Sequence, residues 1–387
     1  MNSPSGPHTG RVDLLFDARH IHQSGIGTYI GKQLVLLQDA VAKRGLSLAV
    51  LVDPDTAPSL REDTAIIPAH PSPAPMYSIG EQKAWDYAIR QVRPRAVWLP
   101  HYPFPFALFR RPNRRILTFV TVHDTIHLLK KSISGQSFAR RMYARTMLNI
   151  DARRCTEIFT ASAATTEALQ HVARSAPLTV AAHPVDPIWL TPVDLTLSPV
   201  QGKYIVYVGN DQPHKNLPLL LDAYREIVGA IPHKLVIAGG GKSVRTHDGR
   251  IQPVLQELGD SVVVTGRLRF DELRALVAAA DLLVMPSLVE GVGMPPLEAM
   301  AARTAVVSSD IPSLRETCGD DGADYFDPHD QHGLAHLIRD YCLDDDARTA
   351  LADRGWTWVT ERQSRLSFTT AVDAICSILA TDRNTGS

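Results

Sequence analysis

Residues 281–316, with the sequence DLLVMPSLVEGVGMPPLEAMAARTAVVSSDIPSLRE, contain two short apolar runs separated by a helical segment. The run DLLVMPS (281–287) predicts a buried strand, and AVVSSD (305–310) predicts a second one. Between them, PPLEAMAA (295–302) predicts a helix that begins near its prolines, which a first helical turn tolerates because its amides have no helical partners. Strand, helix and strand in this order are typical of a parallel sheet covered by helices.

The same alternation occurs on both sides of a proline-rich segment, 184–202, which we interpret as a linker. Before it we expect strands at 12–19, 46–53, 96–100, 116–124 and 157–162 and helices at 25–45 and 137–155. After it we expect strands at 203–209, 234–240 and 261–266 and helices at 217–230, 271–280 and 364–382. The 387 residues exceed one ordinary core, so we predict an α/β protein with one domain in residues 1–195, a second in 196–365, and a cleft between them.

Composition excludes several classes of protein. The net charge of −1 gives no reason to expect a nucleic-acid partner. The four cysteines are far apart and form no C-x-x-C pair, which argues against a disulfide framework or a zinc site. The N-terminus lacks the apolar core of a secretory signal, and no run of 18 apolar residues is present. We therefore expect a cytoplasmic protein with polar tails at both ends.

Two carboxylates and a helix start make the 281–316 stretch a candidate site. Glu290 lies in the loop and Glu298 in what we expect to be the first helical turn. Backbone amides of Val292, Gly293 and Met294 would point out of the helix start, a favourable position for an anionic or polyhydroxylated group. The structural alternative is that Glu298 only complements the helix dipole and that Glu290 is a solvated loop charge.

The segment PSLVEGVGMPPLEAM resembles the signature of retaining glycosyltransferase family four, in which P-S is followed by E-G-F-G-L-P-x-L-E-A-M. Val292 and Met294 stand where the family usually has Phe and Leu. The resemblance implies the GT-B fold, two facing Rossmann-like domains, with a last helix (366–387, including the tail) that crosses back to the first domain. It implies that Glu298 binds the ribose of a nucleotide-sugar donor and Glu290 the transferred hexose.

A second element, YVGNDQPHKN (207–216), resembles the family's loop for the donor diphosphate. Gly209 and Lys215 match, whereas His214 stands where an arginine is common. The resemblance therefore implies that Lys215 contacts the phosphate, and Arg267 is a candidate for the second cation.

The first half carries two further resemblances. FDARHIHQSGIGTYI resembles the family's opening strand and glycine loop, and we expect Gly25 and Gly27 to let the backbone approach the ligand. The next glycine, at 31, departs from the dinucleotide pattern G-x-G-x-x-G. TVHDTIHL resembles the family's H-D element, which implies that His123 lies beside the transferred sugar. We expect Ser162 to cap the following helix and to have no further role.

The triplet Asp53-Pro54-Asp55 invites a metal interpretation, because glycosyltransferases of the other major fold hold a divalent metal with D-x-D. It follows a strand about fifty residues into the chain, and a complete second domain with its own phosphate loop comes later. We interpret it as a turn at the end of a strand and predict no metal and no other cofactor. Lys215 and the helix amides would then neutralise the leaving diphosphate.

These patterns predict a retaining, metal-independent hexosyltransferase. Family members that begin with G-I-G-x-Y are often bacterial mannosyltransferases of polysaccharide biosynthesis, so the resemblance favours GDP-mannose as donor and a glycan or lipid-linked glycan as acceptor. A UDP-sugar donor stays open as an alternative, because no motif indicates which base is bound. Three alternative functions also stay open: a 2-epimerase, a glycogen-synthase-like enzyme and a non-catalytic glycan-binding protein. The missing glycine weakens the case for an NAD-dependent oxidoreductase.

Charge is uneven along the chain. Residues 87–154 hold 14 Lys or Arg against two acids. Apolar residues interleave with these cations, and we expect Phe104, Phe106, Leu108, Phe109, Phe138 and Tyr143 to be exposed. Such a surface can lie on an anionic membrane, so we expect peripheral association with the inner face of the cytoplasmic membrane. The alternative is that the arginines pair with acids elsewhere or solvate the domain.

Overall fold

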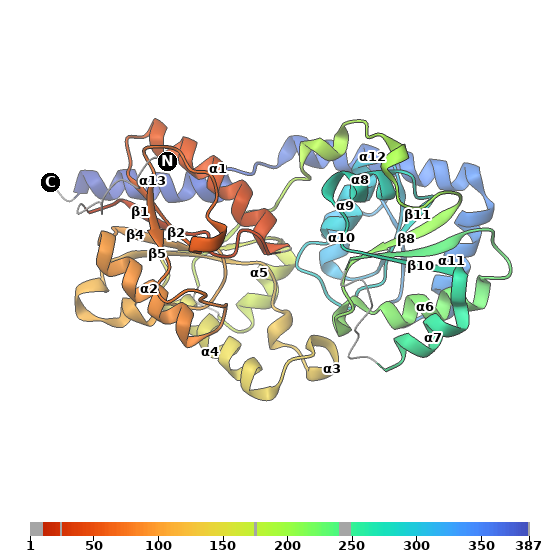
Figure 1. Cartoon of the computed structure of the whole chain (residues 1–387), viewed down its shortest axis with the longest axis horizontal. Helices are drawn as coiled ribbons and strands as arrows, with labels where there is room; N and C mark the ends of the chain where they lie inside the picture. The colour runs from red at the N-terminus through yellow and green to blue at the C-terminus, as the bar shows by residue number, and fades with distance from the viewer. Residues whose placement is uncertain (1–10, 24, 174–175, 240–248, 386–387) are drawn as a thin grey trace.

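The computed structural model describes residues 11–385 except 24, 174–175 and 240–248, and it contains two parallel sheets in two lobes (Figure 1). The first sheet has seven strands in the order β3-β2-β1-β4-β5-β6-β7. These strands are β1 (Leu14–Asp17), β2 (Leu48–Val52), β3 (Ala65–Pro68), β4 (Ala96–Leu99), β5 (Leu117–Val122), β6 (Glu157–Thr160) and β7 (Leu178–Val180).

The second sheet has six strands in the order β10-β9-β8-β11-β12-β13. They are β8 (Tyr204–Val208), β9 (Lys234–Ala238), β10 (Val262–Gly266), β11 (Leu282–Met285), β12 (Ala305–Ser309) and β13 (Asp324–Phe326). The strands of both sheets pair in parallel, so the α/β fold with two sheets is confirmed. We keep the boundary at 195/196 as a proposal; β7 ends and β8 begins on either side of it.

Helices connect the strands and bury their apolar stripes against both faces of each sheet. In the first domain these are α1 (Ile26–Lys43), α2 (Ile79–Val92), α3 (Lys131–Ser134), α4 (Phe138–Arg154) and α5 (Ala163–Gln170). In the second they are α6 (Leu217–Ile227), α7 (Ile251–Leu258), α8 (Phe270–Ala278), α9 (Met294–Ala301), α10 (Pro312–Cys318) and α11 (Gln331–Leu343).

The two last helices join the domains. Helix α12 (Asp345–Arg365) packs on the second domain, and α13 (Thr370–Thr385) lies beside α1 on the first (Figure 1). Buried α13 residues such as Val372, Ile375 and Leu379 share one apolar core with α1 and β1. The helix expected at 364–382 is therefore two helices with a break at 366–369, and the expected C-terminal tail is helical as far as Thr385.

The proline-rich linker contains two short 3-10 helices, Pro187–Leu190 and Leu195–Leu197. Proline has no amide proton for a longer ladder, which explains the short elements. The expected N-terminal tail, 1–10, lies outside the described residues. Across the part of the chain that the structure describes, every helix is too short or too polar to cross a lipid bilayer.

Strand order fixes where ligands can bind. In the first sheet, successive strands are added on one side of β1 as far as β3 and then on its other side from β4; in the second sheet the same change occurs between β8 and β11. Loops that leave the carboxyl ends of such neighbouring strands diverge to opposite faces, and ligands bind in the crevice between them. Candidate residues should therefore lie on the loops after these four strands and after β5, the next neighbour of β4.

Candidate functional site

Lys215 and Glu290 are brought together by neighbouring strands. Lys215 ends the 3-10 helix Pro213–Lys215 after β8, and Glu290 lies in the loop after β11. The Nζ of Lys215 is 2.7 Å from Oε1 of Glu290, and the two side chains are only 16% and 9% exposed. A part-buried ion pair of this kind is desolvated and can rearrange around an incoming anion.

The start of helix α9 lies in the same loop. Gly293 precedes the helix with φ 86°, and a Cβ there would overlap Leu314, so glycine is required at this position. The amides of Val292, Gly293 and Met294 donate to no protein acceptor in the described part of the chain, as an anion site requires. The helix begins at Met294, which places Glu298 in the second turn; the expectation of a first-turn position was wrong.

Glu298 is half-buried, and its carboxylate has no hydrogen-bond partner among the described residues. Burial raises its pKa to about 7, and the negative charge of Asp186 raises it further. A carboxylate placed beyond the first turn gains little from the helix dipole. Its unfilled acceptor sites therefore fit hydroxyl donors from a ligand better than they fit a capping role.

Gly209 and Arg267 are placed differently. A Cβ at Gly209 would meet the Tyr207 hydroxyl at 2.7 Å, and the Gly209 amide donates to the Ala238 carbonyl, so packing of the chain itself accounts for this glycine. Arg267 follows β10 and is exposed. Its distance from the Lys215–Glu290 pair is not fixed by any contact, and its role as a second cation stays a prediction.

His123 follows β5 on the first domain, at the carboxyl edge of the sheet. Its Nε2 donates to the Pro100 carbonyl at 2.9 Å, and its ring meets that of Tyr29 edge to face at 4.7 Å between centroids. Burial lowers the pKa of His123, against the opposing effects of the Pro100 carbonyl and Asp124. The imidazole is therefore neutral at pH 7, and its Nδ1 is left as an acceptor.

The two glycines of the loop before α1 differ in the space around them. Gly25 is exposed with φ 68°, and a Cβ there would point into open space. Gly27 is buried, and a Cβ would lie 2.5 Å from the Ile21 carbonyl. Gly27 thus allows the turn to fold on itself, and its expected approach to a ligand, like that of Gly25, stays a prediction.

The two domains touch close to the candidate site. Ser162 caps α5 as expected, but its Oγ also donates to the Gly291 carbonyl of the second domain at 2.6 Å. The expectation that Ser162 has no further role was wrong. A Cβ at Gly291 would overlap the His123 carbonyl, and Glu316 accepts from the first amides of α5 at 2.8 and 2.9 Å. These contacts bring the loops after β5 and β11 against one another.

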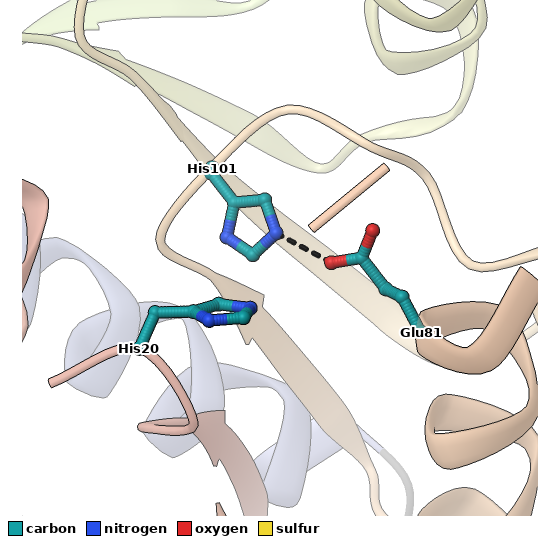
Figure 2. Close-up of side chains that lie close together, drawn as sticks. All are labelled: His20, Glu81 and His101. Carbon is teal, nitrogen blue, oxygen red and sulfur yellow. Dashed lines mark hydrogen bonds and ion pairs between the residues drawn. The ribbon is translucent and has the colours of Figure 1, made fainter. Parts of the chain in front are cut away.

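Sequence reasoning missed a buried polar cluster at the carboxyl edge of the first sheet (Figure 2). Glu81 accepts from His101 Nε2 at 2.6 Å and from Arg19 at 3.3 Å, and Arg19 also pairs with Asp17 at 2.6 Å. His20 lies below the pair, and its Nε2 is buried without a partner. Asp17 is the last residue of β1, and His101 lies two positions beyond the end of β4, so polar residues at strand ends were the signal that could have found them.

His20, Glu81 and His101 are also the group of described residues whose ligand atoms could converge on a metal ion. The cluster contains a buried arginine that already contacts Glu81. Asp17, Glu81 and Arg19 together carry one net negative charge when both carboxylates are ionised. A divalent ion would exceed that charge beside the guanidinium of Arg19, so the cluster suits a metal ion poorly.

The D-P-D triplet forms the predicted turn. β2 ends at Val52, and Asp53 caps the 3-10 helix Pro54–Thr56 by accepting from the Asp55 amide at 3.2 Å. The Asp53 carboxylate also accepts from Ser72 at 3.1 Å. Asp53 is therefore engaged in shaping the turn.

The basic region, 87–154, is partly paired and largely exposed. Arg90 and Arg110 pair with Asp86, and Arg95 pairs with Asp13 and Asp382. Phe104 and Leu108 are 1% and 2% exposed, so their expected exposure was wrong; their side chains turn into the core. Tyr143 is only half-buried.

The exposed residues of the basic region are of two kinds. The exposed apolar side chains are Phe106, Phe109, Phe138 and Met142. The exposed cations include Arg111, Arg114, Arg115, Lys130, Lys131, Arg140, Arg145, Arg153 and Arg154.

Residues 196–358 match the family described as "Glycosyl transferases group 1". The match covers β8 to β13 and both loops that carry Lys215 and Glu290. The second domain is therefore similar to the domains of this family. Family four in particular is a finer assignment than this match provides.

Known proteins extend the likeness to the rest of the chain. The O-antigen chain mannosyltransferase RfbU of Salmonella typhimurium is 28% identical over 222 residues, 57% of this chain and 59% of RfbU. The sucrose-phosphate synthase of Thermosynechococcus elongatus has the same fold, with a TM-score of 0.73 at 18% identity over 97% of this chain and all of that one. HepE of Anabaena, solved with UDP and glucose, gives 0.68 at 17% identity over 96% of this chain and all of HepE. The chain therefore has the GT-B architecture and mannosyltransferase homologues.

Proposed function

We propose that the protein is a retaining hexosyltransferase that moves mannose from GDP-mannose to a glycan or lipid-linked glycan in polysaccharide biosynthesis. One observation carries this proposal: Lys215 and Glu290 lie 2.7 Å apart beside the unpartnered amides at the start of α9. A cation, free amides and two carboxylates in one loop system suit a ligand with a diphosphate and two sets of hydroxyls.

Each residue has a distinct role in this proposal. Lys215 and the α9 amides hold the diphosphate, Glu298 accepts from the ribose hydroxyls, and Glu290 accepts from the hexose. His123 offers its Nδ1 lone pair from the opposite wall. The C1–O bond to the diphosphate breaks as the bond from C1 to the acceptor oxygen forms on the same face. The acceptor proton passes to the leaving diphosphate oxygen, and Lys215 stabilises the negative charge that develops there.

The mannosyl donor is supported by the RfbU homologue, and HepE gives a specific reason to keep a UDP-sugar as the second candidate. Thermal stabilisation separates the two, because a ligand that binds the folded state raises the melting temperature by mass action. We expect GDP-mannose and GDP to stabilise the protein more than UDP-glucose and UDP at equal concentration. Stabilisation by the UDP pair alone would assign the other donor, and stabilisation by neither pair would contradict a nucleotide-sugar site.

A measurement of donor turnover separates enzymes from binding proteins. Slow hydrolysis of the nucleotide sugar, accelerated by glycan acceptors and with retention at C1, is expected of the transferase. Donor binding without any turnover would instead favour a non-catalytic glycan-binding protein on this fold.

We propose that the acceptor is met at the inner face of the cytoplasmic membrane. Phe138 and Met142 are one helical turn apart on α4 and are 73% and 45% exposed. Arg154 at the end of α4 lies over the ring of Phe109, which joins this end of the helix to the 3-10 helix Phe106–Phe109, whose two phenylalanines are exposed. Exposed aromatic and basic residues on one domain suit an anionic leaflet.

A further inference from the structure

Three aromatic rings from three loops meet at the carboxyl edge of the first sheet. Tyr77 precedes α2, Tyr102 follows β4, and His127 lies in the 3-10 helix Ile126–Leu128 after β5. The centroid of the Tyr77 ring is 5.5 Å from that of Tyr102 and 5.8 Å from that of His127, and the last two are 5.8 Å apart. We call these three residues the aromatic triad.

The aromatic triad adjoins the donor side of the cleft. The side chains of His127 and Asp124 lie close enough to His214, on the second domain, to alter its pKa. Burial lowers that pKa, while Glu290 and Asp124 raise it. A Cβ at Gly291, the residue after Glu290, would lie 3.1 Å from the Cβ of Asp124, and Asp124 accepts from the Ile126 amide beside His127. The loop that carries His127 therefore meets the loop of Glu290 across the domain boundary.

The surroundings of the triad favour an uncharged ligand. Burial raises the pKa of both Tyr77 and Tyr102, and the carboxylate of Asp124 raises it further. Both phenols are therefore neutral donors and acceptors in a negatively polarised setting, which disfavours a phosphate or carboxylate group. Tyr77 as a residue nevertheless remains 42% exposed, so part of its surface is available to a ligand.

We propose that the aromatic triad is the acceptor subsite and that it binds a neutral sugar ring, an inference that rests on the proposed transferase function. A pyranose has apolar C–H faces and a rim of hydroxyls, which match a surface of aromatic rings with polar edges. The sugar held there presents its reactive hydroxyl toward the Lys215–Glu290 side.

The buried polar cluster positions the exposed member of the triad. Tyr77 has φ 62°, a left-handed conformation that is an outlier for a bulky side chain. Its amide donates to Oε2 of Glu81 at 2.7 Å, and Oε1 of the same carboxylate is held by His101 and Arg19. Glu81 is thus a positioning residue, which gives the fully buried cluster in Figure 2 a purpose besides stability.

The test uses the full chain with methyl α-mannoside and mannobiose as neutral probes and mannose 6-phosphate as a charged one. Saturation-transfer NMR measures binding, and transfer from GDP-mannose measures KM for each probe. We expect both neutral probes to bind at millimolar concentration in preference to the phosphate. Tyr77→Ala should raise their KM by about tenfold or more, the equivalent of about 1.4 kcal/mol, and Tyr77→Phe, which keeps the ring, should restore most of the loss. Tyr87→Ala, an exposed tyrosine on α2, is the matched control.

Outcomes for the subsite and for the proposed function are separable. If GDP and GDP-mannose stabilise the protein but the glycosides do not bind, or Tyr77→Ala transfers as well as the Tyr87→Ala control, the subsite is wrong while the transferase proposal stands. If no nucleotide sugar binds, the transferase proposal fails first. Glu81→Gln should raise acceptor KM while the melting shift produced by GDP is kept, and an unchanged KM in a folded Glu81→Gln variant would remove its positioning role.

Discussion

The Nζ of Lys215 and the Oε1 of Glu290 form an ion pair of 2.7 Å across the loops that follow β8 and β11. The cation proposed for the diphosphate is thus neutralised, before any ligand binds, by the carboxylate proposed for the hexose. A diphosphate that carries a larger negative charge competes for the lysine and frees Glu290 for hydroxyl donors. The proposed function therefore predicts that donor binding and organisation of the sugar site are coupled through this one contact.

Replacement of Lys215 by alanine is expected to lower kcat by orders of magnitude. A charged contact to a developing phosphate contributes about 3 kcal/mol or more, roughly 100-fold in rate. Steady-state kinetics with the best nucleotide sugar measures the effect, and circular dichroism checks the fold. Lys234→Ala, at an exposed position on β9, is the control. Activity of Lys215→Ala close to that of the control would remove Lys215 from the site.

Replacements of the two carboxylates are expected to change different kinetic and binding constants. Glu298→Ala should mainly weaken donor binding, because its unpartnered oxygens await the ribose hydroxyls. Glu290→Ala should mainly lower kcat by about tenfold to 100-fold, the value of a hydrogen bond to a charged group that tightens in the transition state. Titration calorimetry with GDP gives the first effect and single-turnover kinetics the second. Equal losses of melting temperature with unchanged kinetics in both variants would favour purely structural roles.

The raised pKa of Glu298 predicts how nucleotide affinity changes with pH. Hydroxyl donors favour the ionised carboxylate, so affinity should be complete above about pH 7 and should fall by up to tenfold per unit below it. Glu298→Gln should remove this dependence. The raised pKa of Glu298 also affects the free energy of unfolding. The contribution of Glu298 to this free energy is highest below its ordinary pKa of 4.5, and it is lost as the pH rises through its folded-state pKa of about 7. Glu298→Gln should therefore melt above the wild type at pH 8, and less so at pH 5. A pH-independent Kd in the wild type would contradict both expectations.

The parallel strands and the loops that carry Lys215 and Glu290 could be predicted because local sequence determines them. Apolar runs that end in polar residues located β1, β5, β8 and β11, and the motif around Glu290 identified its loop. Contacts between distant segments could not be predicted in this way. The Ser162–Gly291 hydrogen bond crosses 129 positions, and the Arg19–Glu81 pair crosses 62. Gly27 shows the same limit, because only the folded turn reveals that its missing side chain makes room for the Ile21 carbonyl.

Activity is expected to survive excess chelator. Asp53 is engaged in a turn, and Glu81 of the His20–Glu81–His101 group already pairs with the buried guanidinium of Arg19. Metal analysis of the purified protein and assays with EDTA test this expectation. Loss of activity with EDTA and its recovery with manganese or magnesium would contradict it. If zinc co-purified and was lost in His101→Ala, the cluster rather than the D-P-D turn would be the metal site.

Binding to anionic vesicles is the expected behaviour of the α4 surface. Each cation near the leaflet contributes about 1 kcal/mol, and Phe138 supplies apolar area at the same place. The wild type should sediment with vesicles that contain phosphatidylglycerol at low salt and should be released by high salt, which screens the attraction. Arg140→Glu combined with Arg145→Glu should weaken binding by about two orders of magnitude or more. Arg141 is unsuitable for this test because it is half-buried.

The control for this experiment is a charge reversal of the same size on the other domain, Arg225→Glu with Arg339→Glu. Net charge changes equally in the two double variants, so a general electrostatic effect would weaken both. A local surface predicts that only the α4 variant loses binding, and that Phe138→Ser reduces the fraction that remains bound at high salt. If the wild type ignores anionic vesicles even at low salt, the membrane proposal fails, and an acceptor free in solution becomes the substrate to seek with the glycoside probes.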